Sequence, residues 1–203
     1  MDLRDPVKIK ERTIPKVENR KKIIDYDYID NGNFKKIITA ISENIENNKD
    51  LHFMFMGDIG IGKTFLSNII RDYLQKSDLK VSLYEIRKIY QEYVRLIGSN
   101  YSDSSDQVNK IANIGKKDIL ILDDLGTEKM VENQITFIKN ILLDRYETIK
   151  KQQCLLTIIT TNFGSEEINS IYGSRVLDRI LEVFTIVNFK GKSLRNKNIK
   201  IIE

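Results

Sequence analysis

The sequence has few of the residues that build metal sites, disulfides and rigid loops. Its 203 residues include one cysteine, Cys154, one histidine, His52, two prolines and no tryptophan. A disulfide framework needs paired cysteines and a zinc finger needs several Cys and His ligands, so both are excluded. Catalysis of the Ser/His/Asp or Cys/His type would have to use His52, because it is the only histidine. We expect Cys154, within an apolar run, to be a small buried residue and His52, beside a predicted strand, to be structural.

Long apolar runs are also missing. No stretch approaches the roughly 18 apolar residues of a membrane-spanning helix, and the charged residues at positions 2–5 are unlike a signal peptide. We therefore expect a cytoplasmic protein without a membrane partner. Hydrophobic residues make up 41% and charged residues 31% of the chain, which is an ordinary globular composition, so the length suffices for one domain with a hydrophobic core.

The small net charge of +4 conceals an uneven distribution. Residues 1–24 contain eight basic and four acidic residues, and residues 190–203 contain five basic and one acidic, so the segment between them is net acidic. Basic ends suit contacts with DNA phosphate or with an acidic partner, although simply solvated ends would have the same composition. We expect a basic N-terminal arm over residues 1–33, a folded domain over residues 34–189 and a basic tail from residue 190 onward.

Predicted strands and helices alternate along the folded domain. Apolar runs predict strands and periodic apolar stripes predict helices. The strands are expected at 51–56, 81–86, 119–122, 155–160 and 183–187, and the helices at 34–45, 63–74, 87–97, 131–150 and 175–181. This alternation predicts an α/β domain with a five-stranded parallel sheet flanked by helices. A polar loop over residues 98–106 is expected to be mobile.

One glycine-rich segment carries the strongest chemical signal. Its residues are Gly57, Asp58, Ile59, Gly60, Ile61, Gly62, Lys63 and Thr64, followed by Phe65, and they fit the phosphate-binding pattern G-x-x-x-x-G-K-[ST]. Glycines allow the backbone to fold so that its N–H groups converge on phosphate oxygens, and the next helix adds its positive N-terminal end. Lys63 is expected to contact the β- and γ-phosphates and Thr64 to bind Mg²⁺. The segment therefore predicts a P-loop that binds a nucleotide.

A pair of carboxylates follows the third predicted strand, where residues 119–122 lead directly into Asp123 and Asp124. At the carboxyl end of a parallel strand, these side chains are expected to lie near the phosphate loop. Asp123 is then predicted to bind the metal, and Asp124 to orient or deprotonate the attacking water, a role that Glu often fills in related ATPases. An Asp-Asp pair also commonly ends a strand as a turn, so that alternative stays open.

Polar and basic residues near the end of the domain complete the predicted site. Asn162 follows the fourth strand in the run Thr-Thr-Asn, where it is expected to hold the attacking water; a plain strand cap is the alternative. Arg175 and Arg179 lie four residues apart, hence on one face of a helix. An arginine supplied to a neighbouring γ-phosphate stabilises the charge of the transition state. A salt bridge of either arginine with Glu182 or another acid is the alternative.

Taken in order, the motifs resemble a known family. The phosphate loop is followed by Leu122-Asp123-Asp124-Leu125-Gly126, by Thr161-Asn162-Phe163, and by motifs at residues 175–180 and 191–195. This order resembles bacterial replicative-helicase loaders of the DnaC/DnaI type, most closely on the DnaI side, over roughly residues 10–203. These loaders are AAA+ ATPases, and IstB-like transposition ATPases are their close relatives. The resemblance implies a P-loop NTPase fold of the AAA+/ASCE class that binds ATP and Mg²⁺.

The resemblance also implies partners and roles. It implies an oligomeric, ATP-dependent switch that engages a DnaB-type replicative helicase and places it on single-stranded DNA. Asn162 then matches the γ-phosphate sensor, and Arg179 is the best candidate for an arginine finger acting in trans, with Arg175 an alternative or helper. Two expected features depart from the family: we expect a short arm where DnaI-type loaders carry a zinc-bearing domain, and we expect no C-terminal helical lid. Arg195 is the residue that would replace the lid's nucleotide-contacting arginine.

Other functions remain open on the sequence alone. Asp124 in place of Glu and the missing lid also fit an ATP-gated adaptor or inhibitor that captures a helicase or transposase without appreciable hydrolysis. A small-molecule kinase would share the phosphate loop. The resemblance to helicase loaders also implies contact with single-stranded DNA at the helix over residues 87–97, which carries Arg87, Lys88 and Arg95. Tyr90 and Tyr93 of this helix have the spacing of core residues, with stacking on bases as the alternative.

Overall fold

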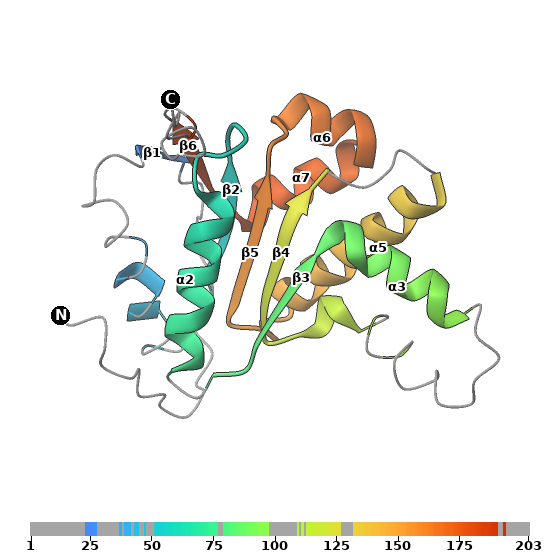
Figure 1. Cartoon of the computed structure of the whole chain (residues 1–203), viewed down its shortest axis with the longest axis horizontal. Helices are drawn as coiled ribbons and strands as arrows, with labels where there is room; N and C mark the ends of the chain where they lie inside the picture. Colours follow the sequence, from blue (N-terminus) through green and yellow to red (C-terminus); the bar gives the residue numbers. More distant parts are fainter. Residues whose placement is uncertain are drawn as a thin grey trace, which may run out of the picture.

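A computed structural model describes the chain at residues 23–27, 37, 39–41, 43, 44, 47, 51–76, 79–97, 109, 111, 113–126, 132–190 and 193. These residues form three layers, with helices on both faces of a central parallel sheet (Figure 1). The predicted mobile loop over 98–106, Arg195, most of the predicted arm and most of the predicted tail lie outside the described residues.

Six parallel strands form the sheet in the order β1-β6-β2-β5-β4-β3. Their bounds are β1 Ile23–Asp27, β2 Leu51–Met56, β3 Val81–Glu85, β4 Ile119–Leu125, β5 Leu156–Thr161 and β6 Thr185–Lys190. The five predicted strands and their parallel arrangement are confirmed. The strand count needs one correction, because β1 lies in the predicted arm and pairs with β6, from Ile23 with Ile186 to Asp27 with Lys190. The sequence of β1, Ile-Ile-Asp-Tyr-Asp, contains two acidic residues and no apolar run, and its pairing depends on a distant neighbour.

Helices connect the strands on both sides of the sheet. Their bounds are α2 Lys63–Gln75, α3 Ile86–Ile97, α5 Glu132–Lys150, α6 Ser165–Tyr172 and α7 Ser174–Val183, and a 3-10 turn, η1, covers Ile114–Lys116. Residues 37, 39–41, 43 and 44 are also helical, within the helix predicted at 34–45. The apolar pattern does not predict α6, since only Ile168 and Tyr172 of its eight residues are buried. Among the described helices, none has the length and apolar character needed to cross a membrane.

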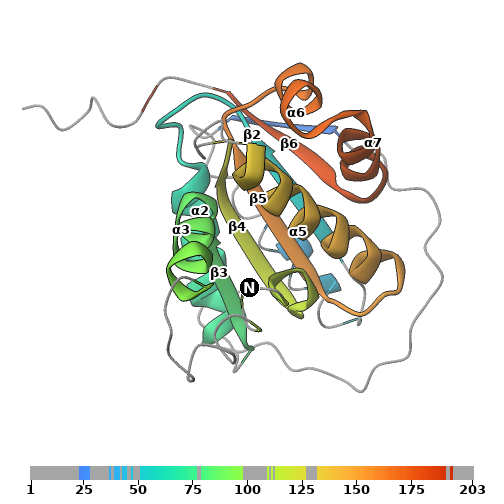
Figure 2. The same cartoon turned by 90° about the vertical axis from the view of Figure 1, so that its right-hand side faces the viewer.

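Alternate residues of the strands β2 to β6 face two separate hydrophobic layers, as the period of a strand requires. Phe53 and Phe55 of β2 pack in the layer that contains α2 and the buried Ile37 and Ile41. Their neighbour Met54 faces the opposite layer, which contains buried residues of α3, α5, α6 and α7. Figure 2 shows α5, α6 and α7 grouped on one side of the sheet. The sheet is therefore covered on both faces, as expected for parallel strands with apolar sequences.

The aromatic residues of α3 contact an aromatic residue of α5. Tyr90 and Tyr93 are half-buried, and their ring centroids lie 5.6 and 4.6 Å from that of Phe137 on α5. Tyr93 stacks on Phe137 and packs against the hydrophobic core, which confirms the prediction for this residue. Tyr90 contacts the same ring but is not part of the core packing, so its assignment as a core residue stays a prediction.

A buried polar cluster lies where β5 begins, at the end of the strand away from Thr161. His52 is 1% exposed, and its Nδ1 is 2.9 Å from Oγ1 of Thr157, which also accepts a hydrogen bond from Nε of Arg145 at 2.7 Å. The Arg145 guanidinium further donates to the backbone oxygens of Gly115 and Leu156, at 3.2 and 2.8 Å. Burial lowers the pKa of Arg145 to about 10. His52 and the buried Cys154 are structural, as predicted.

Candidate nucleotide-binding site

The carboxyl ends of three neighbouring strands bring the predicted motifs together. β2 leads through residues 57–62 into α2, β4 carries the two carboxylates in its last three residues, and β5 leads into Asn162. Because β2, β5 and β4 are adjacent and parallel, these ends lie at the same edge of the sheet, the edge towards α6 in Figure 1. Ligands of open α/β sheets bind at this edge.

The phosphate loop has the backbone geometry that its glycines predict. Gly57, Gly60 and Gly62 have φ values of 140°, 84° and 97°, a region that other residues rarely adopt. A Cβ atom on Gly57 would lie 2.4 Å from the backbone oxygen of Phe189, so no side chain fits there. In α2, which the structure describes throughout, the first turn contains no acidic residue to neutralise its N–H groups. A glycine cradle before an uncapped helix start fits a bound phosphate group.

Lys63 lies at the centre of this loop and is only 5% exposed. Its Nζ donates hydrogen bonds to the backbone oxygens of Gly57 and Asp58, at 2.6 and 2.7 Å, and to Oδ1 of Asn162 at 2.7 Å. The structure therefore joins the predicted phosphate-binding lysine to the predicted γ-phosphate sensor, which is 99 residues away in the sequence.

Two hydroxyl groups hold the first carboxylate of β4. Oδ1 of Asp123 accepts hydrogen bonds from Oγ1 of Thr64 at 3.0 Å and from Oγ1 of Thr160 at 2.7 Å. Burial raises the pKa of Asp123, and the hydrogen bonds from Thr160 and Thr64 act in the opposite direction. A carboxylate and a hydroxyl in contact beside a phosphate loop are hard oxygen ligands of the type that Mg²⁺ prefers. Thr64 and Asp123 are thus brought together, as the sequence predicts.

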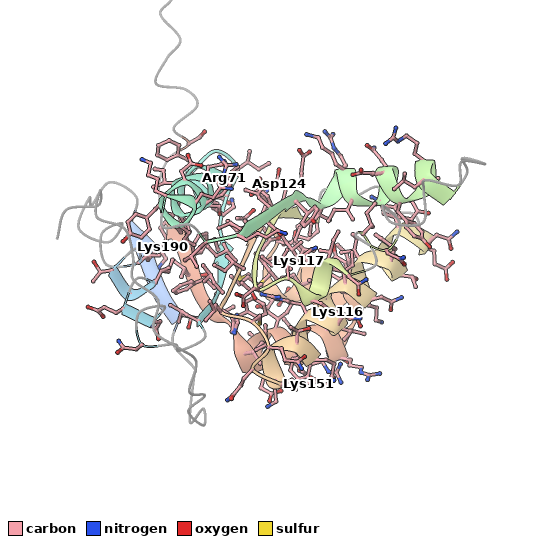
Figure 3. All side chains as sticks on the ribbon, turned by 90° about the horizontal axis from the view of Figure 1, so that it is seen from below. Arg71, Lys116, Lys117, Asp124, Lys151 and Lys190 are labelled. Atoms are coloured by element: carbon pink, nitrogen blue, oxygen red, sulfur yellow. The ribbon has the colours of Figure 1, made fainter. Side chains whose placement is uncertain are left out.

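A β-bulge shapes the second carboxylate. β4 has one residue more than β5 between two pairs of their ladder, at Asp123 and Asp124. Asp124 takes the left-handed conformation, with φ of 61°, and its backbone N–H donates to Oγ1 of Thr160 at 2.9 Å. A bulge redirects side chains that would otherwise alternate between the two faces. Asp124 is half-buried and lies between α2 and the start of α3 in Figure 3.

Thr160 is part of this site although the sequence does not predict a role for it. Its hydroxyl donates to Asp123 and accepts from the backbone of Asp124, so one side chain holds both residues of the bulge. The sequence does contain one indication of this role: two threonines end a strand that is otherwise largely apolar. Its meaning depends on the bulge in the neighbouring strand, which the sequence does not reveal.

The two arginines of α7 differ in their surroundings. Arg175 is exposed. Arg179 is held by α5 of the same chain: its guanidinium carbon lies 4.6 Å from the ring centroid of Tyr146, and its Nη1 lies 3.9 Å from Oε1 of Glu147. The alternative of an ion pair between Arg179 and an acid is therefore observed, but the acid is Glu147. Of the apolar residues at the phosphate loop, Ile59 and Phe65 are exposed by 62% and 56%.

Comparison with known proteins identifies a family and a fold. The sequence pattern of the family described as IstB-like ATP binding protein matches residues 3–201. No curated protein matches the sequence significantly. A solved structure of the DnaC helicase loader is similar with a TM-score of 0.64 and 21% identity, over 78% of this chain and 89% of that one. DnaI gives a TM-score of 0.59 and 20% identity, over 78% and 85% of the two chains.

A replication initiator has the same fold. AMPPCP-bound DnaA from Aquifex aeolicus is similar with a TM-score of 0.58 and 19% identity, over 82% of this chain and 49% of that one. These similarities confirm the predicted P-loop AAA+ fold. The family pattern covers nearly the whole chain, including the phosphate loop, the carboxylates of β4 and both arginines of α7. The chain belongs to the family of IstB-like ATP-binding proteins.

Proposed function

We propose that this protein is a Mg²⁺-dependent ATPase that engages a DnaB-type replicative helicase and helps to place it on single-stranded DNA. The observation that carries the ATPase part is the set of contacts that joins Lys63 to Asn162 and Thr64 to Asp123 at one edge of the sheet. The helicase part is supported by the fold shared with the DnaC helicase loader over most of both chains.

In this proposal the residues of the loop and of α2 bind the phosphates. The glycine cradle and the first turn of α2 supply N–H donors, and Lys63 contributes the positive charge. Thr64 and Asp123 would hold Mg²⁺, which neutralises charge on the phosphate oxygens when it is bound. Ile59 and Phe65, exposed beside the loop, are proposed to contact the rest of the nucleotide.

Hydrolysis needs a positioned water and a second cation. Asp124 is proposed to orient or deprotonate the water and Asn162 to hold it, because both lie at the carboxyl ends of strands next to the phosphate loop. The second cation is proposed to be Arg179 of a neighbouring copy, with Arg175 as helper or alternative. Self-association is therefore part of the proposal; within its own chain, Arg179 contacts Tyr146 of α5.

The test combines binding and turnover. Lys63→Ala is expected to abolish ATP binding, whereas Arg179→Ala is expected to bind ATP and fail to hydrolyse it. Phosphate release is measured with and without single-stranded DNA and a DnaB-type helicase, and capture of the helicase is measured by sedimentation. ATP binding by the Lys63→Ala protein at wild-type affinity, or no ATP-dependent capture by the wild type, would contradict the proposal.

The family pattern favours a second candidate. An IstB-like helper ATPase of transposition, or an ATP-gated adaptor that hydrolyses little, would keep the phosphate loop and replace the helicase by another partner. The short side chain of Asp124, held in a left-handed conformation, is the feature that supports weak hydrolysis. Stoichiometric ATP-dependent binding of a partner without phosphate release distinguishes this candidate from the first.

A further inference from the structure

A polar cluster fastens α7 to α5. It consists of Tyr146, Glu147 and Lys150 of α5 and of Arg179 and Glu182 of α7, and we call it the α5–α7 clasp. The Tyr146 hydroxyl donates to Oε2 of Glu182 at 2.7 Å, and Nζ of Lys150 lies 2.7 Å from Oε1 of the same carboxylate. Figure 2 shows the two helices next to each other. Both helices are thus joined by direct side-chain contacts at the surface.

Within the clasp, Tyr146 contacts α7 at two points. The face of its ring carries the Arg179 guanidinium, whose carbon is 4.6 Å from the ring centroid, and its hydroxyl bonds to Glu182. Glu182 lies three residues after Arg179, so both are on the same side of α7. The bond to Glu182 fixes the Tyr146 ring, and the face of the ring contacts Arg179. The hydrogen bonds from Lys150 and Tyr146 lower the pKa of Glu182, which shows that both groups favour its ionised form.

The clasp restrains a side chain that is flexible by nature. An arginine on a helix surface samples many rotamers, and ordering it on binding costs free energy. The Arg179 side chain is only 23% exposed, because it lies along Tyr146 with Glu147 at its edge. Arg175, one turn earlier on the same helix, is exposed. The two arginines therefore share a helix face, and Arg179 is the one that α5 orders.

We infer that Tyr146 is a positioning residue for Arg179: it holds the guanidinium in the orientation in which a second copy of this chain receives it at its phosphate site. This inference rests on the proposed function, since it needs Arg179 to act in trans. A cation on an aromatic face keeps N–H donors available at its edge, so the contact with Tyr146 orders Arg179 and leaves donors free to meet a phosphate oxygen. The ion pair with Glu147, at 3.9 Å between Nη1 and Oε1, restrains Arg179 only at its edge.

The test uses two kinds of subunit in one mixture. The donor carries Lys63→Ala, so it cannot bind ATP but still has Arg179. The acceptor carries Arg179→Ala, so it binds ATP but lacks the cation. If the mixture hydrolyses ATP faster than either protein alone, the additional hydrolysis comes from Arg179 of the donor acting on ATP bound to the acceptor. Tyr146→Leu is introduced into the donor in one mixture and into the acceptor in another.

Tyr146→Leu in the donor is expected to lower the turnover of the mixture by roughly tenfold, because a misplacement of about 1 Å in a catalytic group can cost up to 10²-fold in rate. The same substitution in the acceptor is expected to leave the turnover unchanged. Tyr146→Phe in the donor is the matched control: it keeps the aromatic face, loses only the bond to Glu182, and is expected to retain most of the turnover. Thermal unfolding of each variant verifies that it is folded.

Each outcome separates the inference from the proposed function. If the mixture without Tyr146 substitutions shows no turnover although the wild type does, the action of Arg179 in trans is wrong, and the inference falls with it. If that mixture is active and Tyr146→Leu in the donor changes nothing or raises the rate, the inference is wrong while the proposed function stands. An equal loss with Tyr146→Leu in donor and acceptor means that Tyr146 only stabilises the fold, which also overturns the inference.

Discussion

Replacing Thr160 by valine tests whether one hydroxyl group holds Asp123 and Asp124 at the carboxyl end of β4. The substitution preserves size and shape but removes the donor to Oδ1 of Asp123 and the acceptor of the Asp124 N–H. A hydrogen bond to a charged group contributes about 1.5–3 kcal/mol and one between neutral groups about 0.5–1.5 kcal/mol. Because Thr160 is fully buried, water does not replace these bonds, and the expected loss of stability is about 3 kcal/mol.

For a chain of this size, that loss corresponds to a fall in Tm of roughly 6–12 °C. Urea unfolding and calorimetry measure it, with Thr160→Ser, which keeps the hydroxyl, as the control expected to lose much less. ATP binding measured with and without Mg²⁺ gives a second readout, since loosening of Asp123 should weaken binding more when the metal is present. A Thr160→Val protein within about 0.5 kcal/mol of the wild type, the usual effect of a neutral substitution, would refute the role assigned to Thr160.

Three further predictions concern other parts of the chain. Gly57→Ala is expected to weaken ATP binding at least tenfold, because its Cβ would lie 2.4 Å from the backbone oxygen of Phe189, and a nucleotide titration measures this. Arg145→Met is expected to lower the free energy of unfolding by about 3 kcal/mol or more, since several buried carbonyl groups lose their donor; urea unfolding checks it. Lys150→Met is expected to raise the pKa of Glu182 towards its ordinary value of 4.5, seen in a carboxyl NMR titration, because the hydrogen bond from Lys150 is the main cause that lowers it. In the wild type, the ionised Glu182 contributes stability above pH 4.5, and this contribution is lost as the pH falls through the lower pKa of the folded state. If the pKa of Glu182 is the same in the Lys150→Met protein and in the wild type, Lys150 is not the cause of the lowered pKa.

Much of the site was predictable because its parts are local in sequence. The phosphate loop is one uninterrupted segment, and its glycines have no other common reason to precede a lysine and a threonine at this spacing. Asp123 and Asn162 each end an apolar run, and the rule that parallel strands present their carboxyl ends at one edge brings them to the loop. The contact of Lys63 with Asn162 and that of Thr64 with Asp123 follow from that rule.

The parts that the sequence does not predict depend on tertiary neighbours. The role of Thr160 exists only because β4 bulges beside it, and a bulge of one residue leaves no mark in the apolar pattern. The strand β1 forms against the edge of β6, so its five residues gain their structure from a partner more than 150 positions away. The contact of Arg179 with Tyr146 likewise joins two helices whose exposed faces have no periodic signal.

The hydrogen bond between Lys63 and Asn162 has a consequence for the way in which a phosphate group would enter the loop. A phosphate oxygen that accepted a hydrogen bond from Nζ of Lys63 would compete with Oδ1 of Asn162 for the same ammonium group. Asn162 directly follows β5, at the start of the connection to α6 and α7, and α7 carries both arginines. The contact therefore links the lysine of the phosphate loop directly to the segment that leads to Arg175 and Arg179.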